Sequence, residues 1–463
     1  MTEYNENNLN EDHDNYMYWQ YEKQIKDGNL QIGKWYSGDS EVTNLRFVEK
    51  FDISTLTLFV SNDMSVKLRS YTLKELTILN SMEQDEDGQQ RWNIQIDDLQ
   101  LENLEVLDLT NINLENSSLY NLSKFNTLRS LNVSKNNVDL TNIHSVTSLT
   151  KLSMVQCGLK NIDQISSLVN LEDLELSSNG DMDLSPLQQV RSLKKLSMQE
   201  CGLTNIDQIT QLTNLEVLKL ASNQLQTIDS IGSLVNLKEL NISKNNNLDI
   251  TPLKDLVGLI KLNLSYCALT QLSALKSLIN LQFLDLLDNP GIIITELQYF
   301  KNLTHLNLND CDLVSIYILR PLINLEELNI SNNNIVHLDA NLDEMKNLKE
   351  LRAEWNRISD FSSVEKHPNY NNLNRNDDTK FTNISYQQDP SEEELHEANN
   401  MRKIESQNIK LKEIQNQRKT LKTVLKNFKQ EINAVLNRMC SNHIQFTTSI
   451  AHLFEKLNQP VSQ

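Results

Sequence analysis

Leucine and isoleucine recur through the middle of the chain in a fixed order of apolar and polar positions. Between residues 104 and 358 the chain repeats L-x-x-L-x-L-x-x-[N/C], and from Leu149 to Leu325 the first leucine of each copy returns every 22 residues. The first leucines are Leu104, Leu128, Leu149, Leu171, Leu193, Leu215, Leu237, Leu259, Leu281, Leu303, Leu325 and Leu348. A period of this length predicts a solenoid in which neighbouring copies stack.

The copy at 215–237 shows how each repeat divides into two parts. From Val217 to Leu220 apolar and polar residues alternate, which predicts a short strand with its leucines facing inward. Ile228, Ile231 and Leu234 then follow at a spacing of three, which suits a 3₁₀ turn. A single copy cannot enclose its own leucines, so each repeat must pack against its neighbours.

Stacking fixes the predicted architecture. Strands about 4.8 Å apart form a parallel sheet on a concave wall, and the bulkier second parts form a convex wall of 3₁₀ or short helical turns. The predicted fold is therefore an α/β solenoid that curves. Ser185-Pro186 and Thr251-Pro252 predict helical turns on the outer wall, each with a capping hydroxyl before a proline at the first helical position.

The last position of the pattern, eight residues after the first leucine, is called here the ladder position. Asparagine there can bond backbone groups of the adjacent turn that burial would leave unpaired. It is held by Asn136, Asn179, Asn223, Asn245, Asn289, Asn333 and Asn356, and by Cys157, Cys201, Cys267 and Cys311. The cysteines lie two or three repeats apart, which is too far for a disulfide, and none has zinc-ligand spacing.

The details of the repeat resemble a known family. The outer-wall segments NIDQISSL (161–168), NIDQITQL (205–212) and TIDSIGSL (227–234) are similar to the SDS22-like class of leucine-rich repeats. Residues 351–372 resemble the closing repeat and cap of that class. The class includes regulators of protein phosphatase 1, and axonemal or cytoskeletal proteins that join such repeats to coiled coils, so the resemblance implies a protein-binding role.

Composition divides the rest of the chain. We predict an acidic disordered tail at 1–20, an N-terminal cap with degenerate repeats at 21–103, repeats with a C-terminal cap at 104–372, a polar linker at 373–391 and a helical tail at 392–459. Ile53, Leu56 and Leu58 make one degenerate copy, and Leu73, Leu76 and Ile78 make another.

The helical tail carries a heptad pattern typical of a coiled coil. The proposed seam includes Leu421, Leu425, Phe428, Ile432, Val435 and Met439. Arg418 at position a and Gln407 and Asn442 at position d interrupt it. Two interpretations stay open, a continuous coil that self-associates and a helix that folds back near Ser441.

Charge and local motifs exclude several classes of function. The formal charge of −19 argues against nucleic-acid binding. The sequence shows no secretory signal and no apolar stretch that could span a membrane, so we expect no membrane association. The expected location is the cytoplasm, and the nucleus is the alternative. A phosphate-binding glycine loop and common hydrolase motifs are missing, so we expect no enzyme, no catalytic residues, no cofactor and no metal.

The concave wall is the remaining candidate for a site. Positions two, four, six and seven residues after each first leucine are expected to face outward, and in the later repeats these positions carry large apolar and charged side chains. The predicted binding residues are Lys261, Tyr266, Phe283, Asp285, Leu287, His305, Glu327 and Trp355. Exposed aromatic residues ringed by charges are typical of a protein-interaction hot spot. The alternative is that the tail or linker covers them.

The sequence thus predicts a scaffold without enzymatic activity that binds a protein partner in the concave groove. Regulation of protein phosphatase 1, an adaptor role in the cytoskeleton and a specificity subunit of an enzyme complex are the three specific roles left open.

Overall fold

The computed structural model describes residues 23–24, 26–32, 42–44, 52–60, 65–80, 99–112, 114, 119, 122–359, 362–365 and 367, scattered positions between 396 and 419, and residues 421–430. The chain divides into two units, 1–391 and 392–463, and each is considered by itself. The predicted acidic tail (1–20) and linker (373–391) lie outside the described residues, as do Ile432, Val435 and Met439 of the proposed seam.

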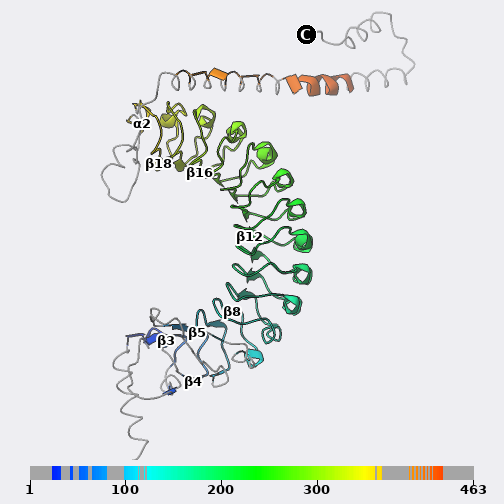
Figure 1. Cartoon of the computed structure of the whole chain (residues 1–463), viewed down its shortest axis with the longest axis vertical. Helices are drawn as coiled ribbons and strands as arrows, with labels where there is room; N and C mark the ends of the chain where they lie inside the picture. The colour runs from blue at the N-terminus through cyan, green and yellow to red at the C-terminus, as the bar shows by residue number, and fades with distance from the viewer. Residues whose placement is uncertain are drawn as a thin grey trace, which may run out of the picture. The chain divides into compact units, whose positions relative to one another are not determined.

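A continuous parallel sheet forms the inner wall of the first unit (Figure 1). Within the described residues its strands follow the order β1-β3-β5-β7 and then run consecutively from β8 to β18. The strands are β1 (Asn29–Ile32), β3 (Thr55–Val60), β5 (Glu75–Asn80), β7 (Val106–Asp108), β8 (Ser130–Asn132), β9 (Lys151–Ser153), β10 (Asp173–Glu175), β11 (Lys195–Ser197), β12 (Val217–Lys219), β13 (Glu239–Asn241), β14 (Lys261–Asn263), β15 (Phe283–Asp285), β16 (His305–Asn307), β17 (Glu327–Asn329) and β18 (Glu350–Arg352). The predicted solenoid with a parallel concave sheet is confirmed.

Short 3₁₀ turns form the outer wall, as the spacing of three predicts (Figure 1). They are η4 (Leu122–Lys124), η5 (Asp163–Ser167), η6 (Ser185–Gln189), η7 (Asp207–Gln211), η8 (Asp229–Ser233), η9 (Thr251–Asp255), η10 (Ser273–Ser277), η11 (Thr295–Tyr299), η12 (Tyr317–Leu319) and η13 (Leu342–Glu344), and helix α2 (Ser362–Glu365) follows. Each repeat therefore buries its apolar residues between a strand and a turn, where a fully buried aliphatic side chain contributes about 1.5–3 kcal/mol.

The capping prediction for η6 and η9 was wrong in its detail. Both turns carry proline near their first position, but neither Ser185 nor Thr251 caps the turn with its hydroxyl. Instead, an aspartate two residues earlier accepts a hydrogen bond from the backbone at the start of each turn. Asp183 accepts from the backbone N–H of Ser185 at 3.0 Å, and Asp249 accepts from that of Thr251 at 2.9 Å. The hydrogen bonds with Ser185 and Thr251 lower the pKa of these two carboxyl groups.

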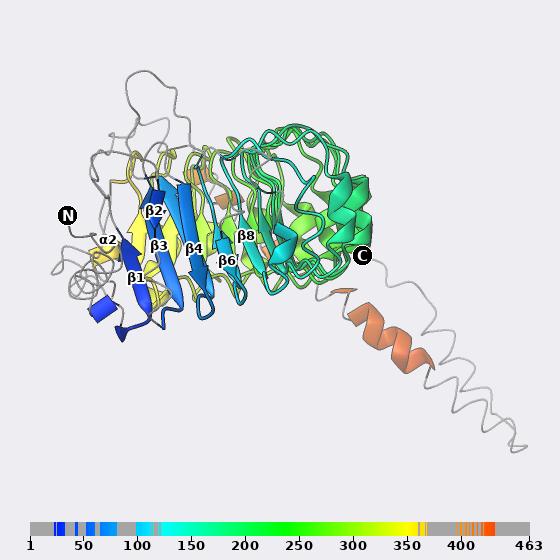
Figure 2. The same cartoon turned by 90° about the horizontal axis from the view of Figure 1, so that it is seen from below.

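The N-terminal repeats build their outer wall from strands rather than from 3₁₀ turns. β2 (Val42–Asn44), β4 (Ser65–Ser70) and β6 (Leu99–Leu101) form a second parallel sheet beside the main one (Figure 2). The two degenerate copies fall in and before β3 and β5, where their leucines and isoleucines are buried. In β4, Leu68 and Ser70 are buried around an exposed Arg69, so the alternation of period two favours a strand there.

The ladder position binds each repeat to the one before it. Asn223 Oδ1 accepts from the backbone N–H groups of Cys201 (3.1 Å) and Leu203 (3.0 Å), and its amide nitrogen donates to the carbonyl oxygens of Met198 and Leu220. These contacts satisfy buried backbone groups that no strand reaches. The four array cysteines are free and buried at the same position.

A second row of asparagines lies at the opposite corner of the solenoid and was not anticipated. Each side-chain amide donates to a carbonyl oxygen 23 residues earlier, as Asn280 does to Val257 at 3.0 Å. The other members are Asn170, Asn214, Asn236, Asn302 and Asn324. Adjacent repeats are therefore joined at two corners.

In the second unit, residues 421–430 form a helix. Leu421, Leu425 and Phe428 of the proposed seam lie on it and are exposed by 60%, 47% and 54%. No partner helix accompanies this stretch among the described residues, so the coiled coil stays a prediction.

Candidate functional site

The parallel register arranges the outward side chains of β14–β18 in two straight rows. Equal positions of neighbouring strands pair directly, because every pairing from β14 to β18 is parallel and in register. The first row is Lys261, Phe283, His305, Glu327 and Glu350, and the second is Asn263, Asp285, Asn307, Asn329 and Arg352. Residues 22 or 23 apart in sequence therefore become lateral neighbours on the concave wall.

Phe283 and His305 form an aromatic pair at the centre of the first row. Their ring centroids are 6.0 Å apart with an interplanar angle of 35°. Both side chains are half-buried, whereas Leu284, which follows Phe283 on the same strand and faces the core, is fully buried. The pair thus presents aromatic surface on the outward side of the sheet, where it adds nothing to the leucine core.

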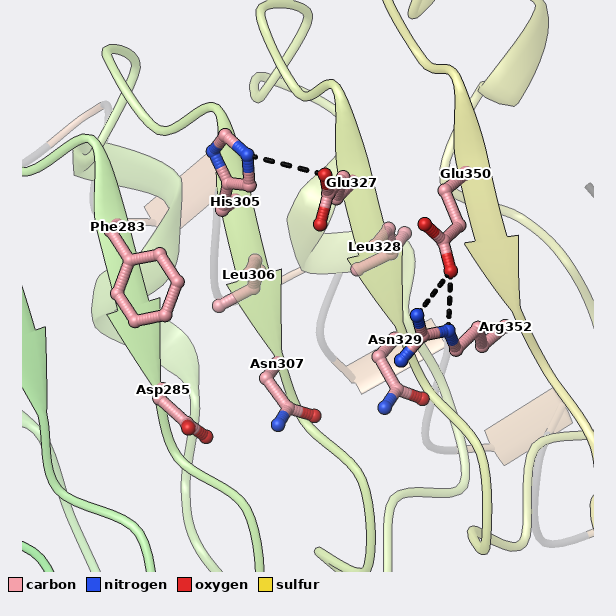
Figure 3. A pocket seen from close by; sticks show the side chains of 10 residues that line it. All are labelled: Phe283, Asp285, His305, Leu306, Asn307, Glu327, Leu328, Asn329, Glu350 and Arg352. Carbon is pink, nitrogen blue, oxygen red and sulfur yellow. Dashed lines mark hydrogen bonds and ion pairs between the residues drawn. The ribbon is translucent and has the colours of Figure 1, made fainter. Parts of the chain in front are cut away.

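A concave pocket of about 150 Å³, called here the Phe283 pocket, opens beside this pair (Figure 3). Phe283 and Asp285 stand along one side, and Glu350 and Arg352 stand along the opposite side. His305 and Glu327 lie toward one end of the strands, and Asn307 and Asn329 lie toward the other. Leu306 and Leu328 complete the lining.

Two ion pairs lie in the pocket lining. His305 Nε2 lies 3.4 Å from Glu327 Oε1, and the Arg352 guanidinium pairs with the Glu350 carboxylate on the same strand. His305 Nδ1 lies 2.8 Å from the hydroxyl oxygen of Thr304, which fixes the plane of the imidazole. The charge of Glu350 is thus balanced locally by a permanent cation, whereas the ion pair that Glu327 forms among the described residues is with a histidine.

Asp285 carries a partly desolvated carboxyl group in the pocket. Burial raises the pKa of its carboxyl group, and the hydrogen bonds from the Leu287 backbone and the Asn307 side chain offset this only in part. The Leu287 N–H donates to Asp285 Oδ1 at 3.0 Å. Among the described residues Asp285 forms no ion pair, so its carboxylate is a charge held without a cation.

The structure brings four of the predicted binding residues into this pocket: Phe283, Asp285, His305 and Glu327. Lys261 pairs with Phe283 in register, but it is exposed and does not line the pocket. The role of all five in binding stays a prediction.

Tyr266, Leu287 and Trp355 do not line the pocket. Tyr266 and Trp355 lie past the strand ends in left-handed backbone, each with φ of 55°. The Tyr266 ring lies 5.7 Å from the ammonium of Lys244, and Trp355 is 52% exposed. Tyr266 and Trp355, both at position seven after the first leucine, thus lie at the loop edge, and the role of Tyr266, Leu287 and Trp355 in binding stays a prediction.

Sequence reasoning missed Asn307, Asn329, Glu350 and Arg352 as pocket residues. All four occupy the same outward strand positions as Phe283 and Asp285 in later repeats, counted from Leu303, Leu325 and Leu348. Their position two or four residues after the first leucine therefore marked them as outward-facing. The prediction omitted them because it selected mainly large apolar side chains.

A second hollow of about 450 Å³ lies on the concave wall at the earlier repeats, from β7 to β12. Its lining holds three lysines and three acidic side chains, of which Lys151 and Asp173 form an ion pair at 3.5 Å. Lys219 pairs with Glu239, which lies outside the lining, at 3.7 Å. The hollow lacks an aromatic side chain, so the Phe283 pocket is the better candidate for an anchor site.

The described residues contain no group of three or more metal-binding side chains, and none of their helices is long and apolar enough to cross a lipid bilayer.

Comparison with known proteins supports the repeat assignment. A family model for leucine-rich repeats, in two copies, matches residues 213–255. The protein is a leucine-rich repeat protein. No curated protein sequence matches this leucine-rich repeat chain closely enough to count as a relative.

Solved leucine-rich repeat structures share its fold. An internalin F from Listeria monocytogenes matches with a TM-score of 0.51 and 23% identity over 70% of this chain and 86% of its own. A leucine-rich repeat protein from Leptospira interrogans gives 0.52 and 23% over 75% and 97%. The functional domain of internalin J from Listeria monocytogenes, described as including a cysteine ladder, gives 0.52 and 22% over 71% and 69%. At these identities the likeness shows the fold alone.

Proposed function

We propose that this leucine-rich repeat protein is a non-enzymatic scaffold that binds a protein partner on its concave face, with the Phe283 pocket as the anchor site. Leucine-rich repeat folds are in general interaction scaffolds that use this face, and no catalytic family is indicated.

One observation carries the choice of site. Phe283 and His305 hold aromatic surface on the outward side of the sheet, at 6.0 Å from each other, where it is half-buried and adjoins a pocket. Aromatic side chains near the centre of an interface typically contribute 2 kcal/mol or more when a partner buries them. The charged side chains around the pair provide the polar rim that such an interface needs.

Three specific roles fit this scaffold. The outer-wall sequence pattern supports a regulator of protein phosphatase 1, because it is similar to the SDS22-like class. An adaptor in the cytoskeleton or axoneme rests on the heptad pattern of the tail, and a specificity subunit of an enzyme complex rests on the concave face alone. The partner recovered in the experiment below distinguishes among them.

The test is a pull-down from native cell extract with mass spectrometry, using wild type, Phe283→Ala and Val257→Ala. Val257 is a matched control because it is an apolar residue 53% exposed that lies outside the pocket. We expect Phe283→Ala to keep the melting temperature and to weaken binding of the recovered partner at least thirtyfold, while Val257→Ala binds as wild type. Binding unchanged by Phe283→Ala would move the site elsewhere.

A further inference from the structure

The geometry points to a more specific occupant: we infer that the Phe283 pocket takes one arginine or lysine side chain from a basic segment of the protein partner. This inference rests on the proposed protein-binding function and adds the chemistry of the group that anchors the partner.

The charge of the pocket lining favours a cationic occupant. The lining holds the carboxylates of Asp285, Glu327 and Glu350 against the single guanidinium of Arg352, so it carries two negative charges with His305 neutral. Glu350 and Arg352 compensate each other as an ion pair. Asp285 and Glu327 therefore remain as two carboxylates that face the pocket without a permanent cation among the described residues.

The state of Asp285 strengthens this argument. Desolvation raises the pKa of its carboxyl group, because the surroundings disfavour the charged form. A cation from a partner would reverse that penalty. An anionic group, such as a phosphate or a carboxylate, would instead meet Asp285 and Glu327, while the cation that could attract it, Arg352, is engaged by Glu350.

The aromatic wall fits the same occupant. Arginine and lysine carry a long aliphatic stem below the charged head, and the stem packs well on an aromatic face. A guanidinium or ammonium within about 6 Å of a ring centroid also gains about 0.5–2 kcal/mol from the cation–π interaction. Phe283 offers that ring beside Asp285 on the same strand (Figure 3).

The size of the pocket limits the occupant to one side chain. A cavity of about 150 Å³ holds a molecule of about the size of benzene, and the Phe283 pocket has about this volume. It admits the head of a single arginine or lysine, whereas the rest of the partner segment must lie along the concave wall.

Charge beyond the pocket favours the approach of a basic segment. The whole chain carries a formal charge of −19. The nearby loop edge adds Asp288, Asp310 and Asp312, where burial and the two neighbouring aspartates raise the pKa of Asp310. A surface of one sign accelerates association with a partner of the opposite sign, and salt screens this effect.

The experiment measures binding of fluorescein-labelled peptide pools to the full chain by fluorescence anisotropy. Each pool is an acetylated nonapeptide mixture of neutral residues with arginine, lysine, citrulline or glutamate fixed at the centre. The variants are wild type, the double variant Asp285→Asn with Glu327→Gln, and the matched double variant Asp108→Asn with Glu239→Gln. Asp108 suits this purpose because, like Asp285, it accepts hydrogen bonds from the residue two places on and from an asparagine amide of the next strand.

We expect wild type and the matched double variant to prefer the arginine and lysine pools over citrulline and glutamate by tenfold or more, and the Asp285/Glu327 double variant to lose that preference. Equal binding of arginine and citrulline by wild type would overturn the inference, as would a preference that survives in the Asp285/Glu327 variant. The two proposals fail separately: a partner captured in a Phe283-dependent manner without any preference for basic pools removes this inference and leaves the proposed function standing.

Discussion

Asn333 holds the turn that contains Cys311 in the preceding repeat. Its Oδ1 accepts from the backbone N–H groups of Cys311 at 3.1 Å and Leu313 at 2.9 Å. Cys311 occupies the same ladder position one repeat earlier, where its thiol donates to the Leu286 carbonyl at 3.3 Å. The thiol reproduces the donor of the amide, but it offers a weaker acceptor than an amide oxygen. Within this array each cysteine repeat is followed by an asparagine repeat that bonds the backbone of the cysteine turn or of the residues after it.

The two asparagine rows should differ in their contribution to stability. Asn289 is fully buried and donates to the Leu264 and Leu286 carbonyls, while Asn280 makes one exposed bond to Val257. Asn289→Ala leaves several buried backbone groups unpaired, so we expect a loss of about 3 kcal/mol or more, whereas Asn280→Ala should cost about 0.5–1.5 kcal/mol. Urea denaturation of both variants checks this order, and equal losses would contradict it.

Cysteine at the ladder position should be replaceable by asparagine but not by leucine. Cys201 and Cys267 donate to the Leu176 and Ile242 carbonyls, each at 3.4 Å. An asparagine keeps this donor, so Cys267→Asn should be tolerated or mildly stabilising. Cys267→Leu removes the donor and adds volume, so we expect a loss of a kcal/mol or more. Thermal denaturation compares the three forms, and equal melting temperatures would refute the assignment. The corresponding asparagine and leucine variants of Cys201 provide an independent test.

Alkaline pH should destabilise the fold through the same thiols. Burial raises the pKa of the Cys267 thiol from 9.0 to about 11, and that of Cys311 to about 12. The unfolded chain therefore releases these protons first, and the stability present below about pH 9 is lost as the pH rises through these folded-state values. Each pKa unit corresponds to about 1.4 kcal/mol. In urea denaturation at pH 7, 9 and 10.5, Cys267→Asn should lose less stability than wild type, and parallel losses would contradict the linkage.

The sequence predicted the architecture well because the repeat encodes it locally. Leu218 and Leu220 can be buried only if neighbouring strands stack. The spacing of three from Ile228 to Leu234 predicted the 3₁₀ turn η8. The outer strands β4 and β6 were not foreseen, because the degenerate copies were recognised by their inner-wall leucines alone.

The candidate site could be predicted only in part for a geometric reason. In β14 to β18 each strand spans three residues, so Phe283 and Asp285 share one flat surface with His305 and Glu327. Tyr266 follows where the backbone turns left-handed, and nothing in its residue type indicates that change of direction. Asparagine and glycine favour that conformation, and the repeat places tyrosine there instead.

Asp285 should be a residue that folding tolerates rather than requires. Because its folded-state pKa is raised, its charged form costs stability above that pKa and its protonated form does not. Asp285→Asn should therefore raise stability slightly at pH 7, within the roughly 0.5 kcal/mol typical of surface substitutions, and leave it unchanged near pH 3. The melting temperature at both pH values checks this, with Asp108→Asn as the control. A loss of stability at pH 7 would show that the carboxylate is structural.

The helical stretch at 421–430 should mediate self-association if its heptad pattern forms an intermolecular seam. Leu421 and Phe428 occupy position d and Leu425 occupies position a, and Val424 next to them is also 59% exposed. Helices usually bury such a stripe against another helix, because an exposed apolar face gains nothing in water.

Lysine at Leu421 and Leu425 places two charges in the seam, so the double variant should be monomeric where wild type is a dimer. The double variant Thr423→Lys with Gln430→Lys adds the same charge on the opposite face and should leave the dimer intact. Multi-angle light scattering measures the mass of each form, and a wild-type monomer at micromolar concentration would mean that this seam does not join two copies of the chain.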